Sequence, residues 1–473
     1  MTWTDLQSPE LAPEVLLAFL TLGLALLDAV LSPRRVSHAS IYLTLFGLLM
    51  ALALALHTWD RPWRGETEWL VGDPAVAFAD VLILCGAVSA TLLAAGMPQA
   101  QQRGGTAILI MLATLGGMIS AGAQDLLTLF VGFELSALSL LAYQALDGKP
   151  RDHHGVRAAL RYAGPAAAAT GLSAFGIACL WSAGGSPAIE TLGTGLTADS
   201  ATQAAVGGGL LLVGLAMRAG AVPFHLWFAD VAVGCAPSAA MLTLSVGVLP
   251  ALIVLGRLTA GPLAMVVPGL NSLLLLLALL SATAGALLVL PQRRLRRLLG
   301  YAVLTNVGFV LAGIATHAGE DPFSGTVWMQ LAALVPAVAG CLAICALAGD
   351  GLGSTASGLA RSRPAQGAAL CLFLVALAGL PPTLAFAGRS ALWSALSGSG
   401  WASVILLLDG LILAYGLIGF AGRVLFHKPP PVEIPPATSA ILSAAMLAAA
   451  VLLLFGMWPS PIARAAEMAA RGG

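Results

Sequence analysis

Charged side chains are scarce in this 473-residue chain. Asp, Glu, Lys and Arg together make up 9% of it, against about a quarter in an ordinary soluble domain. Lysine is the scarcest of the four, because Lys149 and Lys428 are the only two. Acidic and basic residues balance at 22 each, so no net positive field indicates a nucleic-acid partner. With 59% hydrophobic residues and a mean hydropathy of +0.92, the composition predicts a polytopic protein of the lipid bilayer.

Recognisable cofactor motifs are also missing. Cys341 and Cys345, two of only six cysteines, are spaced to share a helix face but have no histidine nearby in the sequence. The 54 glycines are spread through the apolar segments, as close packing of membrane helices requires, and form no nucleotide-binding loop. We therefore expect neither cofactor-binding nor metal-binding residues in this chain, and no redox centre.

Long apolar segments follow one another along almost the whole chain. Their number predicts an all-α membrane protein of about 14 transmembrane helices. The segments cover residues 11–31, 39–57, 74–95, 106–123, 125–146, 157–182, 204–228, 237–258, 269–290, 298–315, 325–347, 364–397, 401–425 and 438–457.

Basic residues predict the orientation of these helices. Most Lys and Arg residues fall in the odd-numbered loops, the densest group being Arg293–Arg297, and few fall in the even-numbered loops or the termini. By the positive-inside rule the odd loops are cytoplasmic and both termini lie on the outer side.

A charge and a proline occur close together at the end of the seventh segment. Arg218 stands five positions before Pro223. Proline removes a backbone hydrogen bond and breaks the helix, which is tolerated at membrane depth only where protein or a water-filled cavity covers the gap. A buried charge beside a broken helix indicates an ion path or a binding site. Pro381 and Pro382 predict a second break, in the twelfth segment.

The two broken segments are five segments apart, so they cross the membrane in opposite directions. This predicts two inverted five-helix repeats, formed by helices 4–8 and 9–13. We accordingly divide the chain into an N-terminal three-helix segment (1–105), a first repeat (106–258), a second repeat (259–425) and a C-terminal helix (426–473).

Three stretches of the sequence carry a family resemblance. Gly220–Val231 (GAVPFHLWFADV), Arg296–Phe309 (RRLLGYAVLTNVGF) and Ala376–Gly388 (ALAGLPPTLAFAG) resemble signatures of the antiporter-like subunits of respiratory complex I, which are related to Mrp antiporter subunits. The opening Leu11–Leu17 (LAPEVLL) and the closing Gly456–Pro461 (GMWPSP) resemble, within that family, the subunit N group. The resemblance covers nearly the whole chain in order.

The resemblance implies a role in proton translocation across a bacterial inner membrane, coupled to quinone reduction by NADH. Both termini would then be periplasmic. NADH, FMN, iron–sulfur clusters and quinone would bind in partner subunits. The expected partners are the antiporter-like subunit M, the small subunits K and J, and the lipid bilayer.

The same resemblance implies which residues form the proton path. The family's helix-5 glutamate matches Glu134, and its lysines on helices 6, 7 and 12 match Arg161, Arg218 and Arg389. The helix-8 lysine position holds Leu249. The family's helix-10 histidine position holds Asn306.

These replacements change the chemistry that the site can perform. A buried lysine can load and release a proton near neutral pH, whereas arginine keeps its proton and Leu249 carries none. We therefore interpret Arg218 and Arg389 as fixed charges. Arg218 would pair with Glu134, either as part of a proton path or as a static ion pair between helices.

Three further residues are candidates for the path or its fixed charges. His225 follows the first break and could shuttle protons or bind freed carbonyl groups. Arg161 lies near the cytoplasmic end of its helix, where it could equally extend to the lipid headgroups. Asp409 could pair with Arg389 or make a polar contact between helices.

Three functions remain open from the sequence. The first is a proton-translocating subunit of a complex I-like NADH:quinone oxidoreductase, and the second is a structural spacer of the same fold without proton transfer. The third is a cation/proton antiporter subunit of the Mrp type.

Overall fold

The structure is a computed structural model of the chain. It describes residues 11–30, 33–59, 65–66, 69–97, 105–146, 154–193, 196–316, 325–352, 356–396, 400–428 and 438–472. Lys149 and the first ten residues, on which part of the predicted orientation depends, lie outside these ranges.

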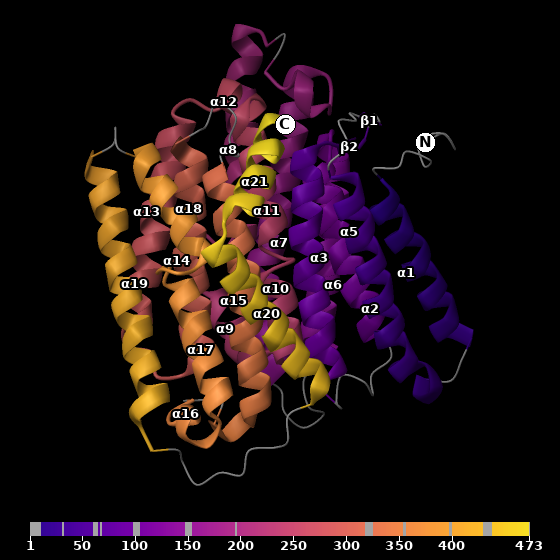
Figure 1. Ribbon diagram of the computed structural model, residues 1–473. Coiled ribbons are helices and arrows are strands. Elements are labelled where there is room, and N and C mark those ends of the chain that lie inside the picture. Colours follow the sequence, from indigo (N-terminus) through magenta and orange to yellow (C-terminus); the bar gives the residue numbers. More distant parts are fainter. Residues whose placement is uncertain are drawn as a thin grey trace.

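The described chain is almost entirely helical (Figure 1). The N-terminal part contains α1 (Ala12–Val30), α2 (Pro33–Thr58), a short hairpin of β1 (Gly65–Glu66) and β2 (Val71–Gly72), and α3 (Pro74–Ala95). The next part contains α5 (Thr106–Gly122), α6 (Leu126–Leu146), α7 (His154–Gly184), the 3-10 turn η2 (Ile189–Thr191), α8 (Ala198–Arg218), α9 (Trp227–Gly234), α10 (Pro237–Leu244), α11 (Leu249–Ala260) and α12 (Pro262–Val266). The last part contains α13 (Leu270–Val289), α14 (Leu295–Thr316), α15 (Gly325–Leu352), α16 (Leu359–Ser362), α17 (Pro364–Leu377), α18 (Leu384–Ala395), α19 (Gly400–Phe426), α20 (Ser439–Met457) and α21 (Ser460–Gly472).

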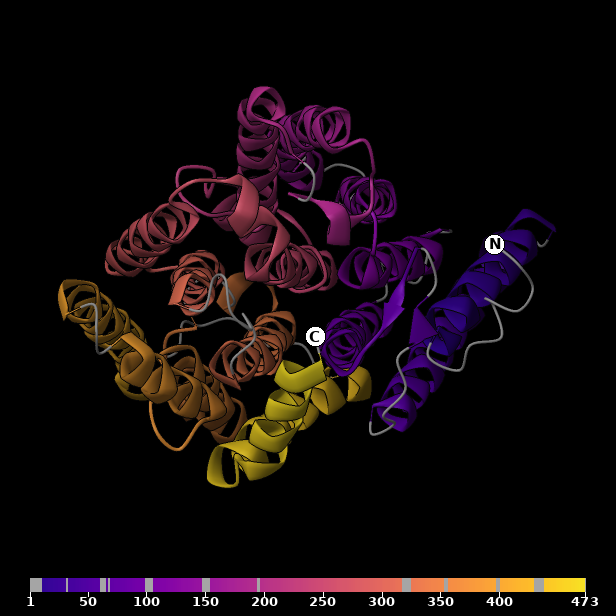
Figure 2. The same cartoon turned by 90° about the horizontal axis from the view of Figure 1, so that it is seen from above.

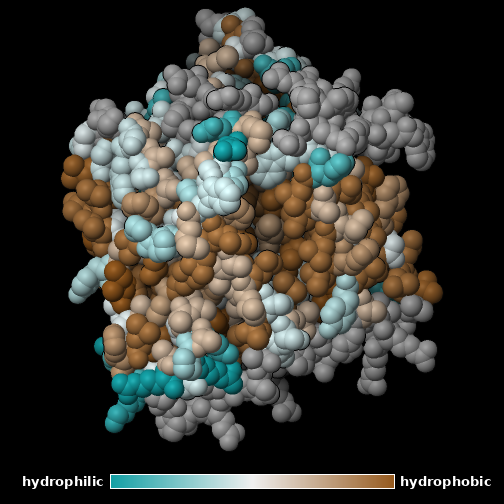
Figure 3. All heavy atoms as spheres, in the orientation of Figure 1, coloured by the Kyte–Doolittle hydropathy of each residue, from teal (hydrophilic) through white to brown (hydrophobic). Residues whose placement is uncertain are grey.

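The helices have the length and composition of membrane spans. Twelve described spans are long and apolar enough to cross a bilayer, and Thr106–Gly122 and Pro364–Leu377 are shorter apolar helices. Together they correspond to the fourteen predicted segments, which confirms the fold class. On the face seen in Figure 3, hydrophobic side chains fill the middle of the molecule, and hydrophilic ones gather towards its two ends.

The two predicted breaks are present, and they have opposite directions. The seventh segment forms α8 and α9, and the twelfth forms α17 and α18. In Figure 1 the chain descends from α8 to α9 but rises from α17 to α18, as inverted repeats require. The eighth segment differs from the prediction, because Ser245–Val248 interrupts it between α10 and α11. Pro250 in the first turn of α11 signals this third interruption, because it has no N–H to bond the Val246 carbonyl four residues earlier, and the sequence prediction did not use it.

The two breaks share one short sequence pattern. Ala219–Pro223 reads AGAVP and Ala378–Pro382 reads AGLPP, so both have Ala-Gly at the helix end and a proline three residues later. The glycine takes a left-handed conformation in each, with φ +69° at Gly220 and +65° at Gly379. Such a conformation ends a helix and is easily adopted only by glycine.

Backbone hydrogen bonds repeat between the two breaks as well. The Ala221 N–H donates to the Ala216 carbonyl at 2.9 Å, and the Leu380 N–H donates to the Val375 carbonyl at 3.2 Å. Both bonds span five residues and close the end of a helix. The following peptide bonds to Pro223 and Pro382 are cis.

The terminal parts of the chain pack together along one side. Helix α20 contacts α15, α3 and α18, while α1 and α2 form the outer edge beside α3 and α5 (Figure 2). The predicted C-terminal helix is α20, and a further helix, α21, follows it and packs on α3 and α15. Gly456 of α20 lies against the second break, since a Cβ there would be 2.0 Å from the Pro382 carbonyl oxygen.

Candidate functional site

Glu134 of α6 and Arg218 of α8 form an ion pair inside the molecule. The Arg218 Nη2 group donates to Glu134 Oε1. The side chain of Arg218 is 6% exposed and that of Glu134 is 22% exposed. The two charges that the sequence suggested as partners are therefore brought together, and only the carboxylate keeps partial access to its surroundings.

Two neutral groups complete this site. Thr170 of α7 donates to Glu134 Oε1 at 2.7 Å, and Arg218 Nη2 lies 3.2 Å from the Thr170 hydroxyl oxygen. The Arg218 guanidinium also lies 4.9 Å from the centre of the Phe133 ring. Sequence reasoning missed Thr170, because a hydroxyl five residues after Pro165 of a long apolar helix resembles an ordinary packing residue. The site thus joins three consecutive membrane segments.

The break explains why Arg218 can lie here. It is the last residue of α8, where the final carbonyl groups of a helix create a negative partial charge that favours a cation. Ala219 and Gly220 turn the chain away after Arg218, so no further helical turn follows it. The guanidinium is directed at α6. His225 lies in the connection between α8 and α9, and its buried Nδ1 has no hydrogen-bond partner among the described residues.

Arg389 of α18 binds the end of the other half-helix. Its guanidinium donates to the Ala378 carbonyl, to the Leu377 carbonyl at 3.0 Å and to Asn306 Oδ1 at 3.0 Å. The Phe309 ring centre lies 4.3 Å away. Arg389 is 2% exposed, and no Asp or Glu of the described residues forms an ion pair with it. This arginine therefore caps α17 as a buried charge surrounded by neutral groups.

Asp409 of α19 is placed apart from Arg389. Its carboxylate accepts a hydrogen bond from the Thr283 hydroxyl of α13 at 2.9 Å, and the residue is 2% exposed. This is the polar contact between helices that the sequence left open, and not the ion pair with Arg389. Asp409 and Arg389 nevertheless lie in the same region, because a Cβ added at the neighbouring Gly410 would be 3.9 Å from Arg389 Nη1.

Arg161 of α7 pairs with Asp230 of α9 at 2.5 Å. Its side chain is 66% exposed, so it lies at the surface and does not point into the interior. The structure therefore does not bring Arg161 together with Glu134 and Arg218.

We expect Arg161→Met to change the stability by less than about 1 kcal/mol, because exposed ion pairs contribute little. Thermal unfolding of the detergent-solubilised protein measures this change. A loss of several kcal/mol would show that Arg161 has an interior role.

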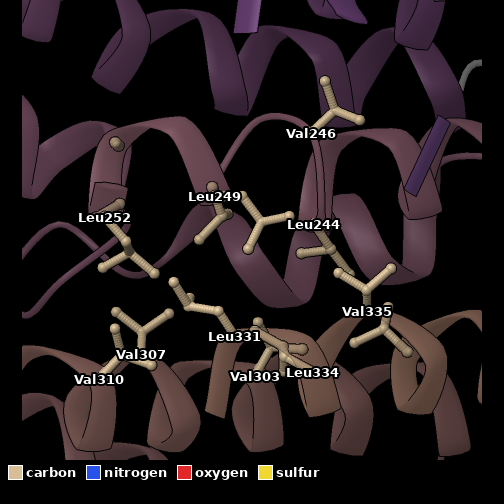
Figure 4. Packing of buried hydrophobic residues seen from close by; sticks show 14 of the residues in the cluster. Leu244, Val246, Leu249, Leu252, Val303, Val307, Val310, Leu331, Leu334 and Val335 are labelled. Carbon is tan, nitrogen blue, oxygen red and sulfur yellow. The ribbon is translucent and has the colours of Figure 1, made fainter. Parts of the chain in front are cut away.

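The contact of α10 and α11 with α14 and α15 is hydrophobic around Leu249. Helix α11 contacts both α8 and α14, and Leu249, its first residue, is fully buried. In Figure 4 the side chains of α10 and α11 point towards those of α14 and α15, with Leu249 and Leu252 facing Val307 and Leu331. We call Leu249, Leu252, Val307 and Leu331 the leucine layer. The polar groups at Arg218 and at Arg389 are thus on helices separated by an apolar contact.

A second buried polar cluster lies in the N-terminal part. Glu14 of α1 and Asp80 of α3 are 7% and 3% exposed, and Glu14 Oε2 and Asp80 Oδ1 have no hydrogen-bond partner among the described residues. Glu14 was noted in the sequence only as part of the opening motif. Among the described residues, no group of three or more His, Cys, Asp or Glu side chains could hold a metal ion.

Comparison with known proteins identifies the family. The family model described as NADH:quinone oxidoreductase/Mrp antiporter, TM, matches residues 123–413, which include both breaks. Fold and site thus define a membrane protein of the NADH:quinone oxidoreductase/Mrp antiporter class. A relative from Desulfitobacterium hafniense, NADH-quinone oxidoreductase subunit N, is 30% identical over 97% of both chains. The chain belongs to the family of NADH-quinone oxidoreductase subunit N, which confirms the resemblance drawn from the motifs.

Other similar proteins support the same placement. A subunit N from Cereibacter sphaeroides is 33% identical, covering 94% of this chain and 96% of the relative. A chain of respiratory complex I from Thermus thermophilus superposes with a TM-score of 0.81 at 27% identity, covering 98% of this chain and all of that chain (100%). A chain of the Mrp complex from Dietzia sp. gives a TM-score of 0.87 at 19% identity, covering 98% of this chain and 97% of that one, which shows the shared fold alone.

Proposed function

We propose that this chain is a membrane-arm subunit of a proton-translocating NADH:quinone oxidoreductase and that Glu134 is its protonatable group. The observation that carries the proposal is the buried Glu134–Arg218 ion pair beside a broken helix. A carboxylate can exchange a proton, whereas the guanidinium keeps its own. Arg218 then acts as a fixed charge that holds Glu134 ionised until the local balance changes.

We propose that water reaches this pair more easily than it passes the leucine layer. Glu134 is the more exposed partner, at 22%, and hydration weakens an ion pair because it raises the local dielectric constant. When the pair separates, Glu134 takes up a proton and Arg218 stays charged. Proton transfer beyond this point requires water to enter the leucine layer, which in its dry form separates the two halves.

We assign different roles in this path to His225, Asp409 and Arg389. His225 can pass protons between water molecules at the first break. Asp409 is a second carboxyl group with a hydroxyl partner, towards the end of the path in the second repeat. Arg389 is the fixed charge of that repeat, and Arg161 stays outside the path as a surface ion pair.

The remaining parts of the assembly follow from family membership. We propose that NADH, FMN, iron–sulfur clusters and quinone bind in other subunits, and that subunits M, K and J are the neighbours. We also propose a bacterial inner-membrane location with periplasmic termini. The division into residues 1–105, 106–258, 259–425 and 426–473 belongs to this proposal and is supported by the matching breaks.

The test compares proton flux at equal electron flux in proteoliposomes that contain the whole complex. The double variant Glu134→Gln/Arg218→Met removes both charges, so neither is left buried alone. We expect fewer protons translocated per electron, because the protonatable group is lost. Glu190→Gln, an exposed glutamate of η2, is the matched control and should pump normally.

An assembled double variant that pumps the normal number of protons would contradict the proposal. That result would favour a structural spacer of the same fold. One observation supports this second candidate, namely the fully buried leucine layer at the interface between the repeats.

A further inference from the structure

A small cavity lies next to the buried charge of Arg389. Its volume is about 10 Å³, and its lining includes Asn306, Gln330, Leu377, Ala385 and Arg389. This is room for about one water-sized species. The lining comes from four helices, α14, α15, α17 and α18, so the cavity lies between packed helices near the second break.

Hydrogen-bond donors exceed acceptors around this cavity. Gln330 of α15 is 7% exposed, and its buried Nε2 has no partner among the described residues. Three donated bonds are known for Arg389, whose guanidinium has five N–H groups. The Leu377 carbonyl accepts from both Arg389 and Asn306 Nδ2, so its two lone pairs are already used.

Positive charges also lie around this cavity. Arg389 has neutral partners only, so its positive charge is met by carbonyl groups at the C-terminal end of α17 and by no ion pair among the described residues. Ala385 is in the first turn of α18, a helix of 12 residues whose N-terminal end carries a positive partial charge. The N-terminal end of α18, Arg389 and the Gln330 amide donor therefore meet at one cavity, opposite the C-terminal end of α17, whose partial charge is negative.

We propose that this cavity binds a small monovalent anion of the chloride type. A water molecule donates two hydrogen bonds, and the Leu377 carbonyl has no lone pair left to accept one, whereas an anion only accepts hydrogen bonds. An anion also compensates a buried charge that is costly when alone. Chloride is larger than water, so its binding requires the Gln330 amide, which is not held at Nε2, to shift. This inference does not depend on the proton path at Glu134.

The experiment uses crystals of the assembled complex soaked in sodium bromide, since bromide replaces chloride and gives an anomalous signal. We expect an anomalous peak between Gln330 and Arg389. Absence of the peak at a well-ordered site would overturn the proposal and leave water as the occupant. This readout does not involve proton pumping, so it is independent of the proposed function.

A solution measurement supports the crystal test. Ligand binding to the folded state raises its stability, so the midpoint of thermal unfolding should rise when gluconate is exchanged for bromide at equal ionic strength. Gln330→Leu should abolish most of this rise, whereas Gln203→Leu, an exposed position on α8, should retain it. Equal shifts in both variants would contradict the site. Should Gln330→Leu fail to assemble, the anomalous peak in the unaltered protein decides.

Discussion

We expect Gly220→Ala to destabilise the protein strongly, whereas Gly209→Ala has almost no effect. Gly220 has φ +69°, and a Cβ at this position would lie 2.0 Å from the ring of Phe228. Phe228 cannot yield easily, because it is fully buried and its ring stacks on Trp227 with centroids 4.4 Å apart. The left-handed conformation costs a non-glycine residue about 1–2 kcal/mol, and overpacking a core costs about 1–3 kcal/mol. Together they predict a loss of about 2–5 kcal/mol.

Gly209 is the matched control because it lies in the same helix, α8, with no atom within 4 Å of an added Cβ. Alanine there favours the helix slightly. The measurement is the midpoint of thermal unfolding of the detergent-solubilised protein, with the membrane yield as a second readout. Equal midpoints for the two variants would mean that the first break can adopt another conformation. Gly220 would then not be required for its left-handed φ or for its close contact with Phe228.

The sequence predicted those parts of the fold that depend on composition and on proline. Apolar length located the spans, and Pro223 and Pro381 located the breaks. The interruption at Ser245–Val248 was missed although Pro250 signals it, because Pro250 removes the backbone hydrogen bond to the Val246 carbonyl. The shared Ala-Gly-x-x-Pro pattern was visible in the sequence, but only the matching φ angles show that it forms the same helix end twice.

The candidate site was predictable to the extent that charges in apolar segments need partners. Glu134 and Arg218 were paired on this ground, and the structure places them together. Arg389 does not pair with a carboxylate. Carbonyl groups freed by the break accept its hydrogen bonds instead. Thr170 and Gln330 were missed, since an uncharged polar residue in a membrane helix becomes conspicuous only when its neighbours in space are known.

Arg218→Met is expected to lower the stability of the protein strongly, because it leaves the charge of Glu134 without its partner. The substitution removes the partner of Glu134 but keeps an apolar side chain of similar length, so the loss of packing is small. Breaking a buried ion pair by removing one partner costs about 3–5 kcal/mol. Glu134 retains the Thr170 hydroxyl and some exposure, which should place Arg218→Met towards the lower end of that range. Glu134→Gln leaves the guanidinium, only 6% exposed, without a carboxylate and should cost at least as much.

The double variant Glu134→Gln/Arg218→Met distinguishes a coupled pair from two independent charges. Because it leaves neither charge alone, its loss of stability should be well below the sum of the two single losses. Unfolding midpoints of the four proteins in one detergent give this coupling, and Arg161→Met/Asp230→Asn provides the comparison with a surface pair, for which the coupling should be small. Additive losses at Glu134 and Arg218 would mean that each charge is stabilised separately, for example by water. In that case Arg218 could not control the charge of Glu134, and the fixed-charge role proposed for it would have to be abandoned.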